Sequence, residues 1–543
     1  MPSYVGNNKF FLIVFISVFY SVSLYLSFNS MLASPTFGPT WDITFFLERY
    51  YDPSFLVNDF TTNITHEKSP RIVYFQLIAN IGSFLNISYY NLLYYLVILI
   101  NIALPVSIFM FLSNIKLFNA IDINIVLIKD FFLAIFIMLA GLNYVNELFS
   151  VASWRVLSLW PNSQSYGLLL SFISGALIVF EDKSKLKIIF ATIFLTASFL
   201  IHISNAILFS IFLLCIILVQ NNKVNNLKII LFSFLFSFFI LKFFYIDDFV
   251  LDADLFLQYF IYDPFIHHHH YVPGLFGPDV GKDTWVIIMA SVAACLSMFS
   301  LIGIYFKNKI IMFVPLLFIV TYTGSAVSQI FFTKYFPIRE IIALGPIRYT
   351  QFDYYILIFI FSSLLALILN KMNFQMIIFF RFNTKKYFLF FILTILLLPA
   401  IPSSSALDYK NLIYKEHKVF FDWVSENTDE KDVFSVPFEP LEFFHVIPIV
   451  GKRSVYYGNT PSYNDKFMQE FSQRQKFTYG HFQDWDEGGP QGFYCNHNTK
   501  SILDASKKFR LNWFIQSNKC AEKKLIKLPV FFSNNNFTVY KVN

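Results

Sequence analysis

Charged residues are scarce in this chain. Asp, Glu, Lys and Arg make up 14% of its 543 residues, whereas hydrophobic residues make up 56%. Soluble globular domains usually carry about 25% charged residues, and a water-soluble globule of this composition would expose too much apolar surface. The shortage of charge therefore excludes an ordinary soluble protein and predicts a polytopic α-helical membrane protein.

Several functional motifs are missing as well. The sequence has no Gly-Lys-Ser loop to cradle a phosphate, no dinucleotide-binding glycine pattern and no Ser-His-Asp order of a hydrolase. The net charge is +6, but the basic residues are scattered over many segments and form no single basic face. The scattered basic residues argue against a nucleic-acid partner, and the cofactor stays unknown.

Cysteine is rare, and the four cysteines divide by position. Cys215 and Cys295 lie in apolar segments, whereas Cys495 and Cys520 lie in the more polar final part of the chain. An oxidising compartment would allow the second pair to form a disulfide. Two unrelated free thiols are the alternative, and the sequence leaves both open.

Long apolar runs fill the chain from residue 10 to about residue 400. A helix needs about 20 apolar residues to cross the hydrocarbon layer, so these runs predict about eleven spans. Because short loops rich in Lys and Arg stay in the cytoplasm, we expect a multi-pass protein of the cytoplasmic or inner membrane, with a cytoplasmic N-terminus and an extracytoplasmic C-terminal domain. The expected spans are 10–28, 88–113, 130–146, 164–180, 188–202, 205–220, 229–246, 285–306, 310–327, 351–370 and 387–401.

The pattern predicts two domains. Residues 1–401 form the multi-span domain, with a long first outer loop at 30–87, and residues 402–543 form an α/β domain. Within the outer loop, 72–85 is too short and too polar to cross a membrane and predicts an amphipathic helix. In the last domain, apolar periodicity predicts helices at 417–427, 464–477 and 501–509, and strands at 433–437, 454–457, 511–516 and 537–541.

The first outer loop groups carboxylates with arginines. Asp42 and Arg49 share one side of a short expected helix, and Asp59 and Arg71 follow them. Transfer of a sugar from a lipid phosphate to a hydroxyl needs a carboxylate to accept the hydroxyl proton and cations to hold the departing phosphate. We therefore take Asp42 and Asp59 as candidate catalytic residues, and Arg49 and Arg71 as candidate phosphate-binding residues. Solvated loop charges or helix caps are the alternative for each.

A later outer segment contains four adjacent histidines at 267–270. We take His268 and His269 as candidates for contact with the substrate. A divalent metal held by two of these histidines with Asp263 or Asp254 is the alternative, but the segment lacks the remaining ligands of a recognisable site. No metal ligand is therefore assigned.

A third outer segment carries Arg339 and Arg348. Arginines on this side break the expected distribution of positive charge, so an anionic partner is the natural reason for them. A phosphate is one such partner, and an ion pair with Glu340 or Asp353 is the other. We include both arginines among the candidate phosphate-binding residues.

This layout resembles the C-type glycosyltransferase fold of membrane enzymes. The resemblance implies a sugar donor linked to polyprenyl or dolichyl phosphate and an essential Asp in the first outer loop, for which Asp42 is the closest match by position. More narrowly, the chain resembles a functionally uncharacterised family of bacterial multi-pass membrane proteins. The stretches that carry this second resemblance are 52–60, 69–71, 268–273 and 453–456, together with Arg474.

The leading hypothesis is thus a glycosyltransferase that takes a sugar from a polyprenyl-phosphate-type donor at the outer face of the membrane. Its expected partners are membrane lipid, the lipid-linked donor and a glycan or protein acceptor. A surface-polysaccharide polymerase or ligase would use the same donor chemistry. A non-enzymatic transporter or envelope-assembly protein is the competing class.

Overall fold

The computed structural model describes most of the chain in separate stretches. They are 9–22, 41–59, 62–63, 72–87, 89–115, 123–140, 163–179, 184–219, 223–245, 331–336, 350–372, 417–437, 447–448, 451–456, 465–480, 489–520, 526–542 and single positions between 297 and 341. The chain forms two compact units. Unit 1 comprises Met1–Ser27, Leu93–Phe244 and His269–Ser403, and unit 2 comprises Phe28–Leu92, Tyr245–His268 and Ser404–Asn543. The sequence-based domains 1–401 and 402–543 stay a prediction.

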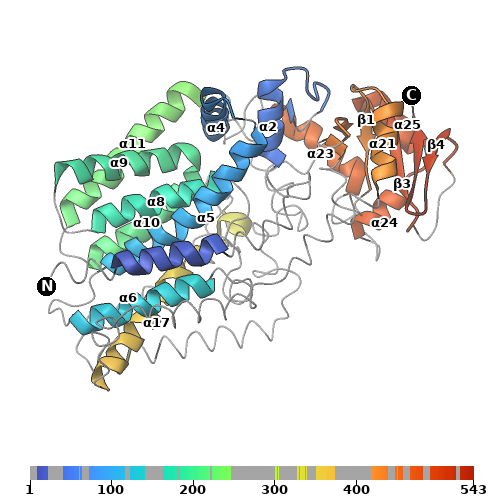
Figure 1. Ribbon diagram of the computed structural model, residues 1–543. Coiled ribbons are helices and arrows are strands. Elements are labelled where there is room, and N and C mark those ends of the chain that lie inside the picture. The colour runs from blue at the N-terminus through green and yellow to red at the C-terminus, as the bar shows by residue number, and fades with distance from the viewer. Residues whose placement is uncertain are drawn as a thin grey trace. The chain divides into compact units, whose positions relative to one another are not determined.

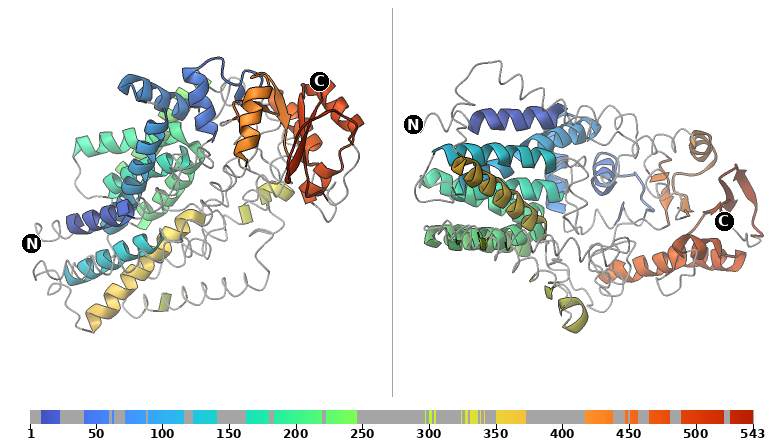
Figure 2. Two further views of the ribbon diagram at one scale, coloured as in Figure 1. Left: turned by 45° about the vertical axis from the view of Figure 1, so that its right-hand side comes forward. Right: turned by 90° about the horizontal axis from the view of Figure 1, so that it is seen from below.

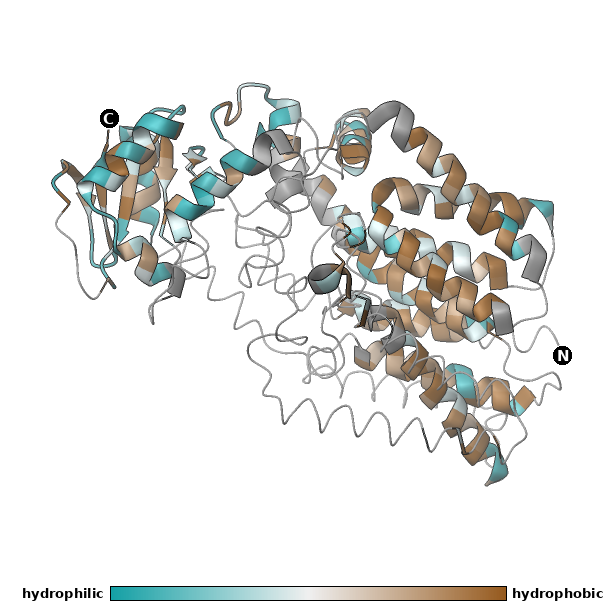
Figure 3. Ribbon diagram, turned by 180° about the vertical axis from the view of Figure 1, so that it is seen from behind, coloured by the Kyte–Doolittle hydropathy of each residue, from teal (hydrophilic) through white to brown (hydrophobic). Residues whose placement is uncertain are grey.

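Unit 1 is helical in its described part (Figure 1). Its elements are a helix at 9–22, most of α5 (Tyr89–Asn114), α6 (Ile123–Ala140), α8 (Ser163–Val179), α9 (Lys185–Ile201), α10 (Ile203–Val219), α11 (Lys223–Tyr245), the short π-helix η2 (Phe331–Tyr335) and α17 (Thr350–Lys371). Most of the residues on these helices are hydrophobic (Figure 3).

Aromatic rings from several helices form the core of unit 1. Phe172 of α8 packs against Phe209 of α10 with ring centroids 5.1 Å apart, and Phe212 stacks on Phe352 of α17 at 5.3 Å. Gly175 allows this approach, since a Cβ at that position would lie 2.7 Å from Phe209. Part of the apolar content of unit 1 is therefore used for packing between helices.

Helices α6 and α17 lie side by side in both views of Figure 2. Leu127 and Ile128 of α6 pack against Ala366 of α17, and Asn124 Nδ2 donates to Asn370 Oδ1 at 2.7 Å. Next to these contacts, buried Lys129 donates to the carbonyl of Ser113 at 2.9 Å, close to the end of α5. A cation at a helix C-terminus is favourable because the last carbonyl groups carry partial negative charge.

The expected polytopic membrane fold is wrong. Among the described residues, no helix combines the length and the apolar character that crossing a membrane requires. Helices α8, α9 and α10 have 17 residues each; at 1.5 Å per residue such a helix is about 26 Å long, against roughly 30 Å of hydrocarbon. The same finding overturns the expected multi-pass localisation, with a cytoplasmic N-terminus and an extracytoplasmic C-terminal domain.

Unit 2 contains a mixed five-stranded sheet with strand order β2-β1-β3-β5-β4. Strands β2, β1 and β3 run parallel, and β3, β5 and β4 run antiparallel. The strands are β1 (Val433–Ser435), β2 (Ser454–Val455), β3 (Trp513–Ser517), β4 (Val530–Ser533) and β5 (Phe537–Lys541). The helices are α2 (Trp41–Tyr51), α4 (Ile72–Leu85), α21 (Lys418–Asn427), α23 (Asp465–Tyr479), α24 (Gly489–Cys495) and α25 (Thr499–Phe509).

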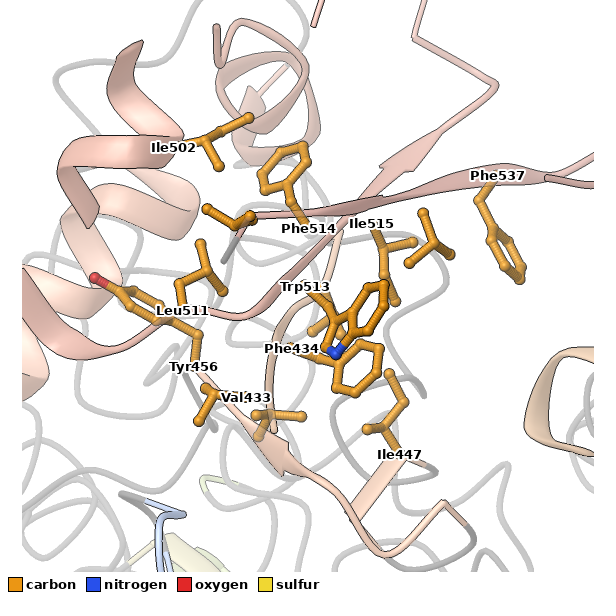
Figure 4. Close-up of a cluster of buried hydrophobic side chains, with 14 of the residues drawn as sticks. Val433, Phe434, Ile447, Tyr456, Ile502, Leu511, Trp513, Phe514, Ile515 and Phe537 are labelled. Atoms are coloured by element: carbon orange, nitrogen blue, oxygen red, sulfur yellow. The ribbon is translucent and has the colours of Figure 1, made fainter. Parts of the chain in front are cut away.

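Strand β3 is buried along its whole length and carries the core of the sheet (Figure 4). Trp513 stacks on Phe434 of β1 with centroids 5.9 Å apart, and its Nε1 donates to Asp432 at 2.7 Å. The next residue, Phe514, stacks on Tyr494 of α24 with ring centroids 5.1 Å apart. Both faces of β3 are thus covered, as expected for a central strand of an α/β sheet.

All seven helices and strands expected after residue 402 are present. The helix at 72–85 is also confirmed, as α4. Helix α24 and strand β4 were not expected from the sequence. Cys495 and Cys520, whose pairing the sequence left open, form a disulfide.

Candidate functional site

Helix α2 carries the first two candidate residues. It ends at Tyr51, because Pro53 disfavours helical geometry in the residue before it. Asp52 then closes a turn, with its Oδ1 accepting from the Ser54 amide at 2.9 Å. This local stop separates α2 from the loop at 52–59 that leads to Asp59.

Asp42 and Arg49 lie seven residues apart on α2. With 3.6 residues per turn, this spacing puts them on the same face, about 10 Å apart along the helix axis. The backbone of Asp42 is described, whereas its side chain lies outside the described part. The expected shared face is therefore consistent with the helix that forms.

Packing and hydrogen bonds hold α2 against α4. Phe46 is buried against Phe75, with ring centroids 5.3 Å apart, and Tyr50 Oη donates to Asn80 Oδ1 at 3.0 Å. Gly82 makes close approach possible, since a Cβ there would lie 2.6 Å from the hydroxyl of Tyr51. The helix with Asp42 and Arg49 is thus fixed to a second helix of the same unit.

Arg49 is half-buried and donates to the loop that follows its helix. Its Nη2 donates to the carbonyl of Leu56 at 2.7 Å and to Asn63 Oδ1 at 3.0 Å, and its Nε donates to the carbonyl of Phe55. Burial lowers the pKa of the Arg49 guanidinium, which nevertheless keeps its charge at neutral pH. Among the described residues, Nη1 makes no hydrogen bond.

The carboxylate of Asp59 is fully buried and accepts three hydrogen bonds. Oδ1 accepts from the amide and the hydroxyl of Thr62 at 2.7 and 2.9 Å, and Oδ2 accepts from the amide of Val455 at 3.0 Å. Burial raises the pKa of the Asp59 carboxyl, while these hydrogen bonds and the charge of Arg474 act in the opposite direction. The carboxylate therefore joins two segments that are far apart in the chain.

Val455 lies in β2, at the edge of the sheet. The amides of Ser454 and Tyr456 donate to the neighbouring β1 segment, through the carbonyls of Asp432 and Phe434. The amide between them points away from the sheet, and it is the one that Asp59 accepts from. An edge strand exposes such unpaired groups, and Asp59 satisfies this one.

Asn58 adds a second connection beside Asp59. Its Nδ2 donates to the carbonyl of Lys431 at 3.2 Å, and its Oδ1 accepts from Arg510 Nη1 at 3.2 Å. We call Asn58, Asp59, Lys431, Val455 and Arg510 the anchor. The anchor attaches the loop after α2 to the C-terminal sheet within unit 2.

Arg453 and Arg474, which belong to the stretches that resemble the bacterial family, have roles within the fold. Arg474 donates to the carbonyl of Tyr456 at 2.7 Å, pairs with Glu470 at 2.7 Å and lies over the ring of Tyr456. Arg453 donates to the carbonyls of Thr428 and Gly451 at 2.6 and 3.2 Å. Both side chains satisfy backbone carbonyls around β2, which helps fix the edge that the anchor uses.

The other candidate residues lie outside the described part of the chain. They are Arg71, His268, His269, Arg339 and Arg348. Their convergence with Asp42 on one groove stays a prediction. Within the described ranges, no three His, Cys, Asp or Glu side chains gather closely enough to hold a metal ion.

Sequence reasoning missed the partners of Asp59. The spacing Asp59-x-x-Thr62 is typical of an aspartate that caps a short helical turn, and this signal could have indicated its contact with Thr62. The contact with Val455 spans 396 positions. No local pattern indicates such a long-range contact.

Comparison with known proteins gives matches in structure only. No protein-family model matches the chain, and no curated protein matches it in sequence, so the narrower bacterial resemblance is not confirmed. The archaeal oligosaccharyltransferase AglB from Archaeoglobus fulgidus, solved with an inhibitory peptide and a dolichol-phosphate, is 11% identical with a TM-score of 0.40. The alignment covers 94% of this chain and 69% of that chain.

A second structure of an Archaeoglobus fulgidus oligosaccharyltransferase, in complex with Zn and sulfate, gives a TM-score of 0.38 at 11% identity. The alignment covers 93% of this chain and 68% of that one. At these values the similarity assigns neither a fold nor an activity to this chain.

Proposed function

We propose that this protein is a glycosyltransferase that takes its sugar from a polyprenyl-phosphate-type donor. The observation that carries the proposal is the shared face of Asp42 and Arg49 on α2. A carboxylate and a guanidinium are the two groups that such a transfer needs, one for the acceptor hydroxyl and one for the departing phosphate.

In this proposal Asp42 is the general base. Its carboxylate accepts the proton of the acceptor hydroxyl as the hydroxyl oxygen attacks the anomeric carbon of the sugar. The bond from that carbon to the phosphate oxygen breaks, and the phosphate leaves with the electron pair. Arg49 stabilises the negative charge that develops on this oxygen, because a guanidinium forms strong hydrogen bonds with phosphate.

The contacts of Arg49 support its role. Three hydrogen bonds through Nε and Nη2 fix the plane of its guanidinium. A cation held in place before the substrate arrives needs little reorganisation during the reaction. Arg71, Arg339, Arg348, His268 and His269 are proposed as further contacts to the donor or the acceptor.

Asp59 is the second candidate for the base, but its contacts support a positioning role instead. Both of its oxygens already accept hydrogen bonds within unit 2. We propose that Asp59 positions α2 through the anchor, and that Asp42 handles the proton. Good positioning matters because small displacements of reacting groups reduce rates strongly.

The test compares Asp42→Asn with Asp52→Asn in the full-length protein. Full-length protein in a mild detergent is incubated with undecaprenyl-phosphate-linked hexoses, and release of undecaprenyl phosphate is measured. We expect Asp42→Asn to lower the rate by about 100-fold or more, because the substitution removes the general base. Asp52 is exposed and closes only a turn, so Asp52→Asn should retain the rate.

The thermal unfolding midpoint of both variants serves as the control for folding. An Asp42→Asn variant that is as stable and as active as the wild type would contradict the assignment of the base. Arg49→Lys provides an independent check, since a lysine keeps the charge but loses the planar fork. We expect Arg49→Lys to weaken donor binding clearly while the thermal unfolding midpoint changes little.

A further inference from the structure

The surface of unit 1 carries a long apolar groove that the transfer chemistry does not use. It has a volume of about 940 Å³, and helices α9 and α11 supply all of its lining residues. The lining consists of Ile188, Ile189, Thr192, Ile193, Thr196, Ala197, Leu200, Lys228, Ile229, Leu231, Phe232, Leu235, Phe236 and Ile240. This volume lies at the upper end of the roughly 300–1,000 Å³ typical of ligand sites.

Two serines set the spacing of the two helices. Ser233 Oγ donates to the carbonyl of Thr192 at 3.3 Å, and Ser237 Oγ donates to the carbonyl of Thr196 at 3.4 Å. Residue numbers rise together in the two pairs, so α9 and α11 run parallel. Both N-termini therefore lie at the same end of the groove.

The groove exposes large apolar side chains. Ile193 is 52% exposed and Phe232 is 61% exposed, and hydrophobic residues dominate α9 and α11 (Figure 3). Contiguous exposed apolar surface of this kind marks a binding site for an apolar ligand or partner.

The ionisable side chain that lines this groove lies at one of its ends. Lys228 is the only ionisable side chain among the lining residues, and it lies near Ile188 and Ile189 in the register that the serines define. Lys185 belongs to the first turn of α9, at the same end, and this turn contains no acidic residue. The N-termini of two parallel helices add partial positive charge there.

The length of the groove indicates the kind of chain that fits. The lining of α9 runs from Ile188 to Leu200, which at 1.5 Å per residue is about 18 Å. One leaflet of a bilayer has a hydrocarbon thickness of about 15 Å, which is half of the roughly 30 Å core. Phospholipid acyl chains therefore match the groove in length and polarity.

We infer that the groove between α9 and α11 binds an anionic phospholipid, with the acyl chains along the helices and the phosphate at Lys228. The inference stands apart from the proposed transfer reaction, because none of the candidate transfer residues lines the groove. It rests on the coincidence of an apolar channel with a cationic lining residue, Lys228, at one end.

The experiment measures lipid binding to the full-length protein in detergent by native mass spectrometry. The probes are phosphatidylglycerol and phosphatidylcholine with identical palmitoyl and oleoyl chains. We expect the anionic lipid to bind about fivefold more tightly, since one lysine near a lipid phosphate contributes roughly 1 kcal/mol. Equal binding of both lipids would overturn the inference.

Two substitutions locate the site. Lys228→Gln should abolish the preference for phosphatidylglycerol, whereas Lys418→Gln, an exposed lysine on α21, should retain it. Ala197→Trp fills the groove and should reduce binding of both lipids at least tenfold. Unchanged binding in Ala197→Trp, with an unchanged unfolding midpoint, would show that the lipid binds elsewhere and would overturn the inference.

Competing occupants give distinct results. A polyprenyl phosphate that displaces phosphatidylglycerol at lower concentration would replace the phospholipid as the occupant. A dimer that dissociates in Ala197→Trp, seen by light scattering, would identify a second copy as the occupant. Inorganic phosphate should not compete, because it lacks the acyl chains that fill the groove.

Discussion

A single carboxylate, that of Asp59, connects two parts of unit 2. It accepts from Thr62 with one oxygen and from Val455 with the other. A carboxylate this deeply buried would be poorly solvated if it lost either partner, and the same burial raises its pKa. The contacts of Asp59 are therefore structural. They hold the loop after α2, so Asp59 affects α2 only indirectly.

Substituting Asn for Asp59 tests this contribution. An amide at this position can accept from Thr62, but its NH₂ group would face the amide of Val455, and two donors cannot pair. We expect a loss of about 1–3 kcal/mol in the free energy of unfolding of unit 2. Chemical denaturation followed by tryptophan fluorescence measures it.

Hydrogen exchange at the amide of Val455 gives a second readout for Asp59→Asn, since this amide should exchange faster once its acceptor is lost. Asp52→Asn is the matched control, because Asp52 is exposed and accepts only within its own turn. Wild-type exchange at Val455 in Asp59→Asn would exclude the anchoring role.

At the scale of elements, close helix packing in unit 1 depends on small residues. A Cβ on Gly175 of α8 would lie 2.7 Å from Phe209 and 2.9 Å from Phe111. Neither ring can move freely, because both pack within the aromatic core. The glycine thus determines how closely α8 approaches α10.

Gly175→Ala should therefore destabilise unit 1 by about 1–3 kcal/mol through overpacking. The thermal unfolding midpoint of the full-length protein measures the effect. Gly324→Ala is the control, since a Cβ at Gly324 meets no atom within 4 Å. Equal midpoints in the two variants would show that the aromatic core adapts without cost.

The sequence predicted those elements whose periodicity is set by a buried face. Helix α21 and strand β5 follow this rule. Strand β4 was missed because it is mostly exposed and its residues do not alternate. Helix α24 was missed because its Gly489-Pro490 start is typical of a turn.

The expected spans failed for a related reason. An apolar run has the same composition whether its helix crosses a membrane or packs inside a bundle, and composition alone does not distinguish the two. In the candidate site, the sequence predicted the shared face of Asp42 and Arg49 from local spacing. It could not predict the anchor, whose partners are hundreds of residues apart.

At the scale of the whole molecule, a disulfide strengthens one of the two units. Cys495 at the end of α24 and Cys520 after β3 close a segment with a sequence separation of 25. Such a crosslink restricts the unfolded chain, and a loop of this size gives about 3 kcal/mol of stability. The stabilisation belongs to unit 2, which contains both cysteines.

The double variant Cys495→Ser/Cys520→Ser should lower the unfolding free energy of unit 2 by about 3 kcal/mol and leave unit 1 unchanged. Calorimetry of the full-length protein, with and without a reducing agent, measures both units. Cys215→Ser is the control, because Cys215 lies on α10 and takes no part in this disulfide. A reducing agent should lower the unfolding midpoint of the wild type only. An equal decrease in the double variant would show that the stability does not come from the disulfide.

The anchor also sets an order of events during synthesis. Asp59 is made 396 residues before Val455, and at a translation rate of about 5–20 residues per second this interval lasts roughly 20–80 seconds. During that time the carboxylate has no β2 amide to bind, although α2 and α4 can already pack together. The loop after α2 must therefore wait until Val455 has left the ribosome before it acquires its final conformation.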